Sequence, residues 1–166
     1  MNLAVNLAVN LNLLFETVIK SELELIGVVQ NMRRIFVEQQ INKTAIVLLQ
    51  GDLSAGKTTL VQYLAKSYQL QQTQSPTFAI HQQYQNQNIR IDHFDLYRLE
   101  TEVEIESSGF WDFFRESCDN HLIAVEWSER VPSEDWPQHL PLFVVKIEIL
   151  EIGLRKISFL QRKNES

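Results

Sequence analysis

The sequence predicts an α/β domain of three layers, with a central mixed β-sheet flanked by helices, and three observations lead to this fold class. Short apolar runs at residues 45–49 and 122–125 are followed by a glycine and by an acid, which is typical of strands buried on both faces. Helical spacing of apolar residues surrounds the first run. Hairpin signals appear only later in the chain. Strands that alternate with helices early and pair in hairpins later indicate a sheet of mixed direction.

The composition is that of a globular domain and argues against several classes of function. The 166 residues leave room for one domain of roughly 150 residues and an appendage. Hydrophobic residues make up 45% and charged residues 22%, and 15 Lys and Arg against 21 Asp and Glu give a net charge of −6. Because this charge does not attract polyphosphates, we do not expect the chain to bind nucleic acid by itself. The single cysteine, Cys118, can form neither an intramolecular disulfide nor a thiolate cluster, so we expect a cytoplasmic protein without zinc.

Residues 1–20 are expected to be an N-terminal extension of unknown role, for which a helix is one option. Its first basic residue comes at its very end, and asparagines interrupt its apolar run, so it resembles neither a secretory signal nor a membrane span. Residues 21–166 are then expected to form a single P-loop ATPase domain, for the reasons given below. The first element of this domain is a helix over residues 21–40, with Ser21 and Glu24 as a capping box.

The following elements alternate between strand and helix before the closing hairpin. Residues 69–74 are a polar stretch without a predicted element, and the proline that follows excludes a helix through Ser75, so residues 75–77 are expected to be a turn. The acidic run over residues 100–106 is expected to be a solvated helix face, and the aromatic residues 110–114 to belong to the core. In chain order, the expected elements are a strand over 45–49, a helix over 58–68, strands over 78–84, 89–94 and 122–125, and a hairpin of 142–150 and 154–160.

The most specific motif is a phosphate-binding loop, in which two glycines separated by four residues precede Lys and Thr. The glycines let backbone N–H groups wrap around a phosphate, and the following helix directs its positive dipole end at that phosphate. Lys57 places an ammonium on the β and γ oxygens, and the Thr58 hydroxyl can ligate the bridging Mg²⁺. The motif therefore predicts binding of a nucleoside triphosphate with Mg²⁺. The predicted nucleotide-binding residues are Gly51, Asp52, Leu53, Ser54, Ala55, Gly56, Lys57, Thr58 and Thr59.

A phosphate-binding loop also needs a carboxylate on a neighbouring strand to hold Mg²⁺. Glu126 ends a buried strand, and ligands of such folds bind at the carboxyl edge of the sheet. Asp95 follows the strand predicted over residues 89–94 in the same way. We therefore expect Glu126 and Asp95 to be the catalytic and metal-binding acids, and nearby Asp92 to be a surface acid at a strand end.

Two further residues each have two interpretations from the sequence. Thr77 is either a switch residue that senses the γ-phosphate through Mg²⁺ or part of a plain proline turn. Trp127 either stacks on a base or fills the core. His93 lies close to Asp95, but no His or Cys follows at zinc-like spacing, so we reject a zinc site.

Together these motifs resemble those of the TsaE (YjeE) family, bacterial P-loop ATPases required for threonylcarbamoyladenosine modification of tRNA. The resemblance runs in the same order through residues 21–160. It implies a P-loop NTPase-like fold and an ATP-hydrolysing accessory subunit that acts with TsaD and TsaB and reaches tRNA only through them. The segments that carry it are the phosphate-binding loop at 51–60, Ser-Pro-Thr-Phe at 75–78, His-Phe-Asp-Leu-Tyr-Arg-Leu at 93–99, Gly109 with Asp-Phe-Phe at 112–114, and Val-Glu-Trp at 125–127.

The resemblance also implies roles for individual residues. Its implied catalytic residues are Lys57, Glu126, Asp95 and Thr77, and its implied Mg²⁺ ligands are Thr58, Glu126 and Asp95. Trp127 becomes a contact on the side of the base. One departure concerns Ser54, where the family usually has glycine; if the backbone there adopts a positive φ, serine costs about 1 kcal/mol.

Three other functions are weighed against this one. A small-molecule kinase also begins with strand, phosphate-binding loop and helix, but no Arg-rich lid insertion follows Glu126. A GTPase would carry an Asn-Lys-x-Asp motif, which is missing from the sequence. A binding module without hydrolysis would lack the two acids, which are present.

Overall fold

The structure is a computed structural model that describes residues 11–77, 80–115 and 118–163, without the side chains of residues 74–77. Its strands are β1 Leu11–Ile19, β2 Thr44–Gly51, β3 Gln71–Thr77, β4 His81–Gln85, β5 Arg90–Asp95, β6 His121–Glu126, β7 Leu142–Glu151 and β8 Leu154–Arg162. Its α-helices are α1 Leu25–Glu38, α2 Lys57–Ser67 and α3 Glu102–Ser107, and its 3-10 helices are η1 Glu22–Glu24, η2 Phe110–Phe114, η3 Ser128–Arg130 and η4 Ser133–Asp135.

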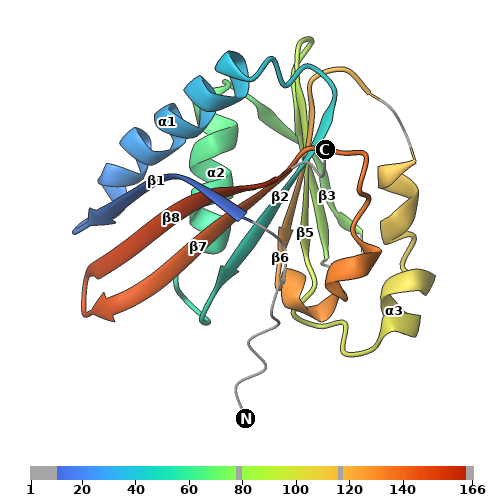
Figure 1. Ribbon diagram of the computed structural model, residues 1–166. Coiled ribbons are helices and arrows are strands. Elements are labelled where there is room, and N and C mark those ends of the chain that lie inside the picture. Colours follow the sequence, from blue (N-terminus) through green and yellow to red (C-terminus); the bar gives the residue numbers. More distant parts are fainter. Residues whose placement is uncertain (1–10, 78–79, 116–117, 164–166) are drawn as a thin grey trace.

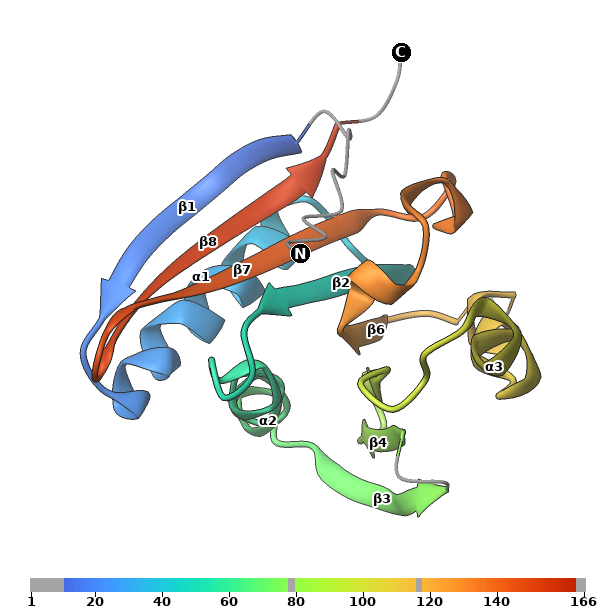
Figure 2. The same ribbon diagram turned by 90° about the horizontal axis from the view of Figure 1, so that it is seen from below.

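The strands of the described chain form one mixed sheet in the order β1-β8-β7-β2-β6-β5-β4-β3 (Figures 1 and 2). The four central strands β7, β2, β6 and β5 run parallel. Antiparallel strands complete the sheet on both sides, β8 and β1 next to β7, and β4 and β3 next to β5. The mixed direction confirms the predicted fold class.

Helices cover both faces of the sheet, which gives the three expected layers (Figure 1). Helices α1 and α2 pack on one face, while α3 and η2 lie on the other. Strand β2 shows why its sequence is continuously apolar. Val47 and Leu49 join the core under α1 and α2, whereas Ile46 and Leu48 join the core under α3. Since alternate side chains enter different cores, a central strand of this sheet has no solvent-facing side.

The first described strand lies within the segment that we expected to be an extension. Residues 11–19 form β1, which pairs antiparallel with β8. Ile19 is buried, and the ring of Phe15 lies 5.4 Å from that of Phe159. The burial of side chains along this edge strand does not alternate regularly, so its sequence carries no clear period of two. The sheet thus begins before Ser21, and residues 1–10 lie outside the described part.

Strand β3 also differs from the expectation, since residues 75–77 were expected to be a turn and no strand was expected before them. The strand pairs antiparallel with β4 at the edge of the sheet. An edge position tolerates Pro76, because the N–H that proline lacks is not needed there. Residues 78 and 79, the start of a predicted strand, lie outside the described residues, and β4 begins at His81.

The capping box expected at the first helix is found at another helix. Ser21 and Glu24 do not form a capping box; Ser21 Oγ donates to Glu24 Oε1 at 3.0 Å, and α1 begins only at Leu25 after a 3-10 turn. A capping box forms instead at α3, between Thr101 and Glu104. None of the helices among the described residues combines the length and apolar character needed to cross a membrane.

Candidate functional site

The predicted phosphate-binding loop joins β2 to α2 at the carboxyl edge of the parallel strands. Gly51 has φ of 151°, and a Cβ at this position would lie 2.5 Å from the carbonyl oxygen of Ile147. Gly56 precedes α2 with φ of 109°. Both glycines are therefore required by the backbone, one by conformation and close approach, the other by conformation.

Lys57, the first residue of α2, is almost completely buried and reaches back across the loop. Its Nζ donates to the carbonyl oxygens of Gly51 at 2.7 Å and Asp52 at 2.9 Å. The same ammonium lies 4.4 Å from the centre of the Trp127 ring. The Lys57 ammonium is thus held at the mouth of the loop, where phosphate oxygens could replace the two carbonyl oxygens as acceptors.

Glu126 ends β6 and faces the start of α2. Its Oε1 accepts a hydrogen bond from Thr58 Oγ1 at 2.6 Å and lies 2.8 Å from His93 Nε2. Burial raises the pKa of Glu126, but the hydrogen bonds from His93 and Thr58 and the positive fields of His93 and Lys57 outweigh burial and lower it. The carboxylate is therefore kept ionised inside the protein.

A cavity of about 370 Å³ opens between the loop and the ends of β5 and β6. Asp95 pairs with Glu126 in the strand register, so the two predicted acids end neighbouring strands in this cavity. Asp95 Oδ1 accepts a hydrogen bond from the Tyr97 backbone N–H at 3.0 Å. The complete lining is Leu53, Ser54, Ala55, Gly56, Lys57, Thr58, Thr59, Asp95, Tyr97, Glu126 and Trp127.

The donor set of this cavity fits Mg²⁺ and a polyphosphate. A hydroxyl oxygen and an ionised carboxylate within 2.6 Å of each other are hard oxygen ligands of the kind that Mg²⁺ prefers. A glycine-bounded loop, a helix N-terminus and a buried ammonium supply the donors for phosphate oxygens. Thr58 and Glu126 are therefore the residues suited to hold the metal, and Lys57 the residue suited to hold the phosphates.

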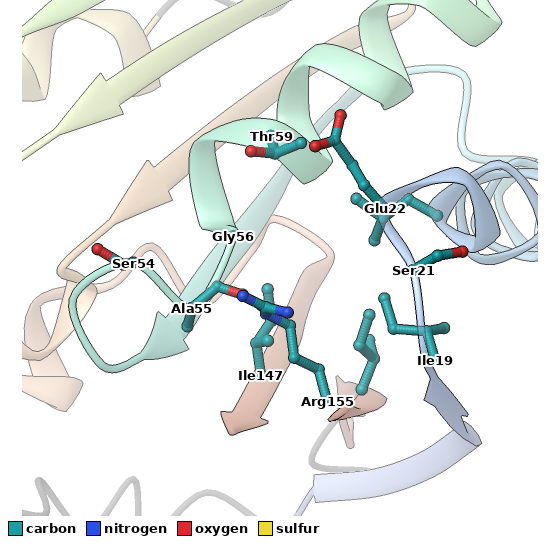
Figure 3. Close-up of a pocket in the computed structure, with 11 residues that line it drawn as sticks. Ile19, Ser21, Glu22, Ser54, Ala55, Gly56, Thr59, Ile147 and Arg155 are labelled. Atoms are coloured by element: carbon teal, nitrogen blue, oxygen red, sulfur yellow. The ribbon is translucent and has the colours of Figure 1, made fainter. Parts of the chain in front are cut away.

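A second cavity, of about 170 Å³, is also lined by the loop (Figure 3). The loop contributes residues 54–56 and α2 contributes Thr59; Ser21 and Glu22 come from the segment between β1 and α1. Arg155 of β8 donates from Nε to the carbonyl oxygen of Ala55 at 2.9 Å. The loop therefore borders two cavities, one lined by Glu126 and Asp95 and one lined by Glu22 and Arg155. No sequence signal pointed to Glu22 or Arg155, because they come from opposite ends of the chain.

Ser54 adopts the left-handed conformation, with φ of 63°. From the sequence, serine is expected to be unfavourable here if φ is positive, and this is the backbone region in which a side chain is strained.

The structure leaves one predicted residue undecided and corrects one expectation. Thr77 is described only in its backbone, as the end of β3 paired with His81. Asp92 is not the surface acid that we expected, because it is fully buried. Its Oδ1 lies 2.7 Å from His81 Nε2, and its Oδ2 lies 2.7 Å from His121 Nε2 and 2.6 Å from Arg90 Nε. Asp92 lies within β5, not at its end as expected, and its side chain points into the protein.

The model of one protein family matches residues 22–157 of this chain, and its description is threonylcarbamoyl adenosine biosynthesis protein TsaE. Two similar curated proteins carry the name tRNA threonylcarbamoyladenosine biosynthesis protein TsaE. The protein from Rickettsia felis is 38% identical over 130 residues, which cover 77% of this chain and 72% of the relative. The protein from Aquifex aeolicus is 32% identical over 124 residues, which cover 73% and 80%.

A solved structure shares the fold. The crystal structure of YdiB from Bacillus subtilis matches with a TM-score of 0.63 and 20% sequence identity, over 94% of this chain and 88% of that chain. At this identity the likeness shows the fold alone.

Proposed function

This chain belongs to the TsaE family, and on that premise we propose that it binds and hydrolyses ATP as an accessory subunit in the synthesis of threonylcarbamoyladenosine in tRNA. The observation that carries the proposal is the cluster of Lys57, Thr58 and Glu126 around one phosphate-binding loop. A cytoplasmic location, where tRNA is modified, is part of the proposal.

The two cavities suggest how ATP would lie. The Lys of such loops contacts the β- and γ-phosphates, and the Thr holds the metal between them. Glu126 and Asp95 line the cavity on that side, so the γ-phosphate belongs there. The α-phosphate and the nucleoside then leave toward the cavity of Glu22 and Arg155. Trp127, which we expected on the side of the base, would instead cover Lys57 beside the γ-phosphate.

Each residue then has a defined task in hydrolysis. When bound, Mg²⁺ neutralises charge on the phosphate oxygens. Lys57 stabilises the negative charge that develops on the transferred phosphoryl group, and Thr58 and Glu126 fix the metal side of the cavity. Asp95, whose Oδ1 is oriented by the Tyr97 backbone N–H, is suited to orient the attacking water. We propose Thr77 as the residue that senses the γ-phosphate.

We further propose that the chain acts with TsaD and TsaB and contacts tRNA only through them. Its net charge of −6 disfavours an independent encounter with tRNA. Hydrolysis by the isolated chain should then be slow and should rise when these partners are added.

The kinase alternative is less well supported by the segment after β6. That segment forms η3 and η4, and its Arg130 Nη2 donates to the Tyr97 carbonyl oxygen at 3.2 Å. An arginine tied to the rim of the cavity is not the mobile lid that excludes water in kinases.

Substitution of Lys57 tests the proposal. We expect Lys57→Ala to lower ATP hydrolysis by about 100-fold or more, because one preorganised donor to the reacting phosphate is lost. Lys66→Ala, an exposed lysine of the same helix, is the matched control and should hydrolyse ATP at the wild-type rate. Phosphate release is measured with ATP and with GTP, with and without TsaD and TsaB, and circular dichroism checks the fold. Strong preference for GTP, or indifference to the partners in binding and in turnover, would contradict the proposal.

A further inference from the structure

Glu126, one of the acids that line the nucleotide cavity, contacts the buried residue His93. His93 lies on β5 two residues before Asp95, so both side chains are on the same face of the sheet. His93 Nε2 lies 2.8 Å from Glu126 Oε1, and the two side chains are only 2% and 4% exposed. Because an ionised carboxylate can only accept, Nε2 of His93 carries the hydrogen and donates it.

The other ring nitrogen of His93 makes no compensating contact. Among the described residues, His93 Nδ1 is buried and has no hydrogen-bond partner. The neighbouring Tyr84 ring is stacked against the imidazole at 6.4 Å, a packing that any aromatic side chain could provide. The polar chemistry of His93 is therefore directed at Glu126, and packing does not explain why the ring is an imidazole.

The two donors to Glu126 differ in what happens to them when a metal is held. Thr58 and His93 contact the same atom, Oε1. Thr58 is also suited to ligate Mg²⁺, so a bound metal would share its hydroxyl oxygen. His93 lies in the sheet and does not line the cavity. Its bond can persist whether or not the metal is held.

We propose that His93 is a positioning residue that fixes the Glu126 carboxylate in the orientation needed to hold Mg²⁺ beside Thr58. Glutamate has three rotatable side-chain bonds, and a buried N–H bonded to one of its oxygens removes most of that freedom. Hydrogen-bond partners of metal-binding carboxylates orient them in this way. The inference rests on the proposed function, because it takes Glu126 as the acid for Mg²⁺.

Two substitutions separate the hydrogen bond from the ring. His93→Phe keeps an aromatic ring against Tyr84 and removes the donor, whereas His93→Gln removes the ring and keeps an amide N–H near the position of Nε2. If His93→Phe does not fold, His93→Asn replaces it, because its shorter amide does not reach Glu126. Thermal unfolding of each variant establishes that it is folded.

The readout is ATP affinity measured by calorimetry, once with Mg²⁺ and once with a chelator in its place. We expect His93→Phe to bind ATP with Mg²⁺ about 10–100-fold more weakly than wild type, the usual loss when such a partner is removed. Affinity without Mg²⁺ should be unchanged, and His93→Gln should stay close to wild type. In a Glu126→Gln background, His93→Phe should have no further effect, because the two residues act as one unit.

Three results would overturn the inference. The first is an equal loss of affinity with and without Mg²⁺, which would indicate a general structural role. The second is a loss in His93→Gln as large as in His93→Phe. The third is an undiminished loss in the Glu126→Gln background. Failure of the proposed function looks different: wild-type protein would then bind ATP neither with nor without Mg²⁺, and the inference would fall with it.

Discussion

Strand β5 supports two buried acid–histidine clusters on opposite faces of the sheet, and they differ in what remains available for binding. On the α3 side, Asp92 accepts from His81 and Gln83 through Oδ1 and faces His121 and Arg90 through Oδ2. On the α2 side, Glu126 accepts from His93 and Thr58, both through Oε1, and the residue lines the nucleotide cavity.

The contrast shows that burial and a lowered pKa do not by themselves mark a functional acid. Burial raises the pKa of Asp92, but the bonds from His121, His81 and Arg90 together lower it well below its ordinary value. The same balance lowers the pKa of Glu126. Two features distinguish Glu126: it lies at a strand end, and its partner Thr58 has a hydroxyl that can contact a bound ligand. Asp92 is enclosed and links side chains of β4, β5 and β6. Glu126 is bonded to His93 on the protein side and borders the cavity on the other side.

The largest expected effect comes from the same isosteric change made at both acids. Asp92→Asn replaces one accepting oxygen with an N–H₂ group that must face donors on either side, so we expect a loss of about 3–5 kcal/mol in the free energy of unfolding. In Glu126→Gln the remaining carbonyl oxygen can still accept from both His93 and Thr58. We expect this variant to lose much less stability but to lose ATP hydrolysis. Urea unfolding and phosphate release measure the two effects.

The comparison would be broken by the reverse result. If Glu126→Gln proved as unstable as Asp92→Asn, the Glu126 cluster would be a structural element like its neighbour. A folded Asp92→Asn protein of unchanged stability would show that the Asp92 cluster tolerates an inward-facing donor.

A smaller effect is expected from acid, because the stability contributed by ionised Asp92 is lost only gradually as the pH falls, once the unfolded chain begins to bind the proton. The pKa of Asp92 is lower in the folded protein than the value of about 3.9 usual for an unfolded chain. Its stabilising contribution is therefore complete above that unfolded value and is lost as the pH falls through it toward the lower folded pKa. Urea unfolding at a series of pH values from about 6 to about 3 measures this loss in the free energy of unfolding. The slope should be shallower in Asp92→Asn than in wild type, and an identical slope would contradict the assignment.

Much of the fold could be predicted because many of its elements have a recognisable apolar pattern in their own sequence. The continuous apolar runs of β2 and β6 reflect burial on both faces, and the spacing in α1 and α2 reflects a single buried face. The edges could not be predicted in this way. β1 and β3 owe their structure to partners, β8 and β4, and their own sequences are too polar or irregular to show a period.

The site could be predicted as far as its residues are contiguous or end a strand. Lys57, Thr58 and Glu126 meet as expected. The importance of His93 and Asp92 could not be predicted, because it depends on which face of β5 each occupies and on partners from β4 and β6. A one-residue difference along the strand separates them, and only the register decides which cluster each joins.

The smallest effect is expected in the phosphate-binding loop, where a positive φ at Ser54 would make serine unfavourable. Ser54 has φ of 63°, a conformation that glycine adopts without strain. We expect Ser54→Gly to raise the free energy of unfolding by no more than about 1 kcal/mol, since relief of strain is partly offset by the greater freedom of glycine in the unfolded chain. Ser54→Ala is the matched control, because it removes the hydroxyl but keeps the strained Cβ, and it should bring no gain. Urea unfolding measures the free energy of unfolding of both variants. An equal increase in both would mean that the Ser54 hydroxyl, and not the strained backbone, destabilises the wild-type loop. Side-chain polar contacts would then set the stability of the loop, as they do in the Asp92 cluster.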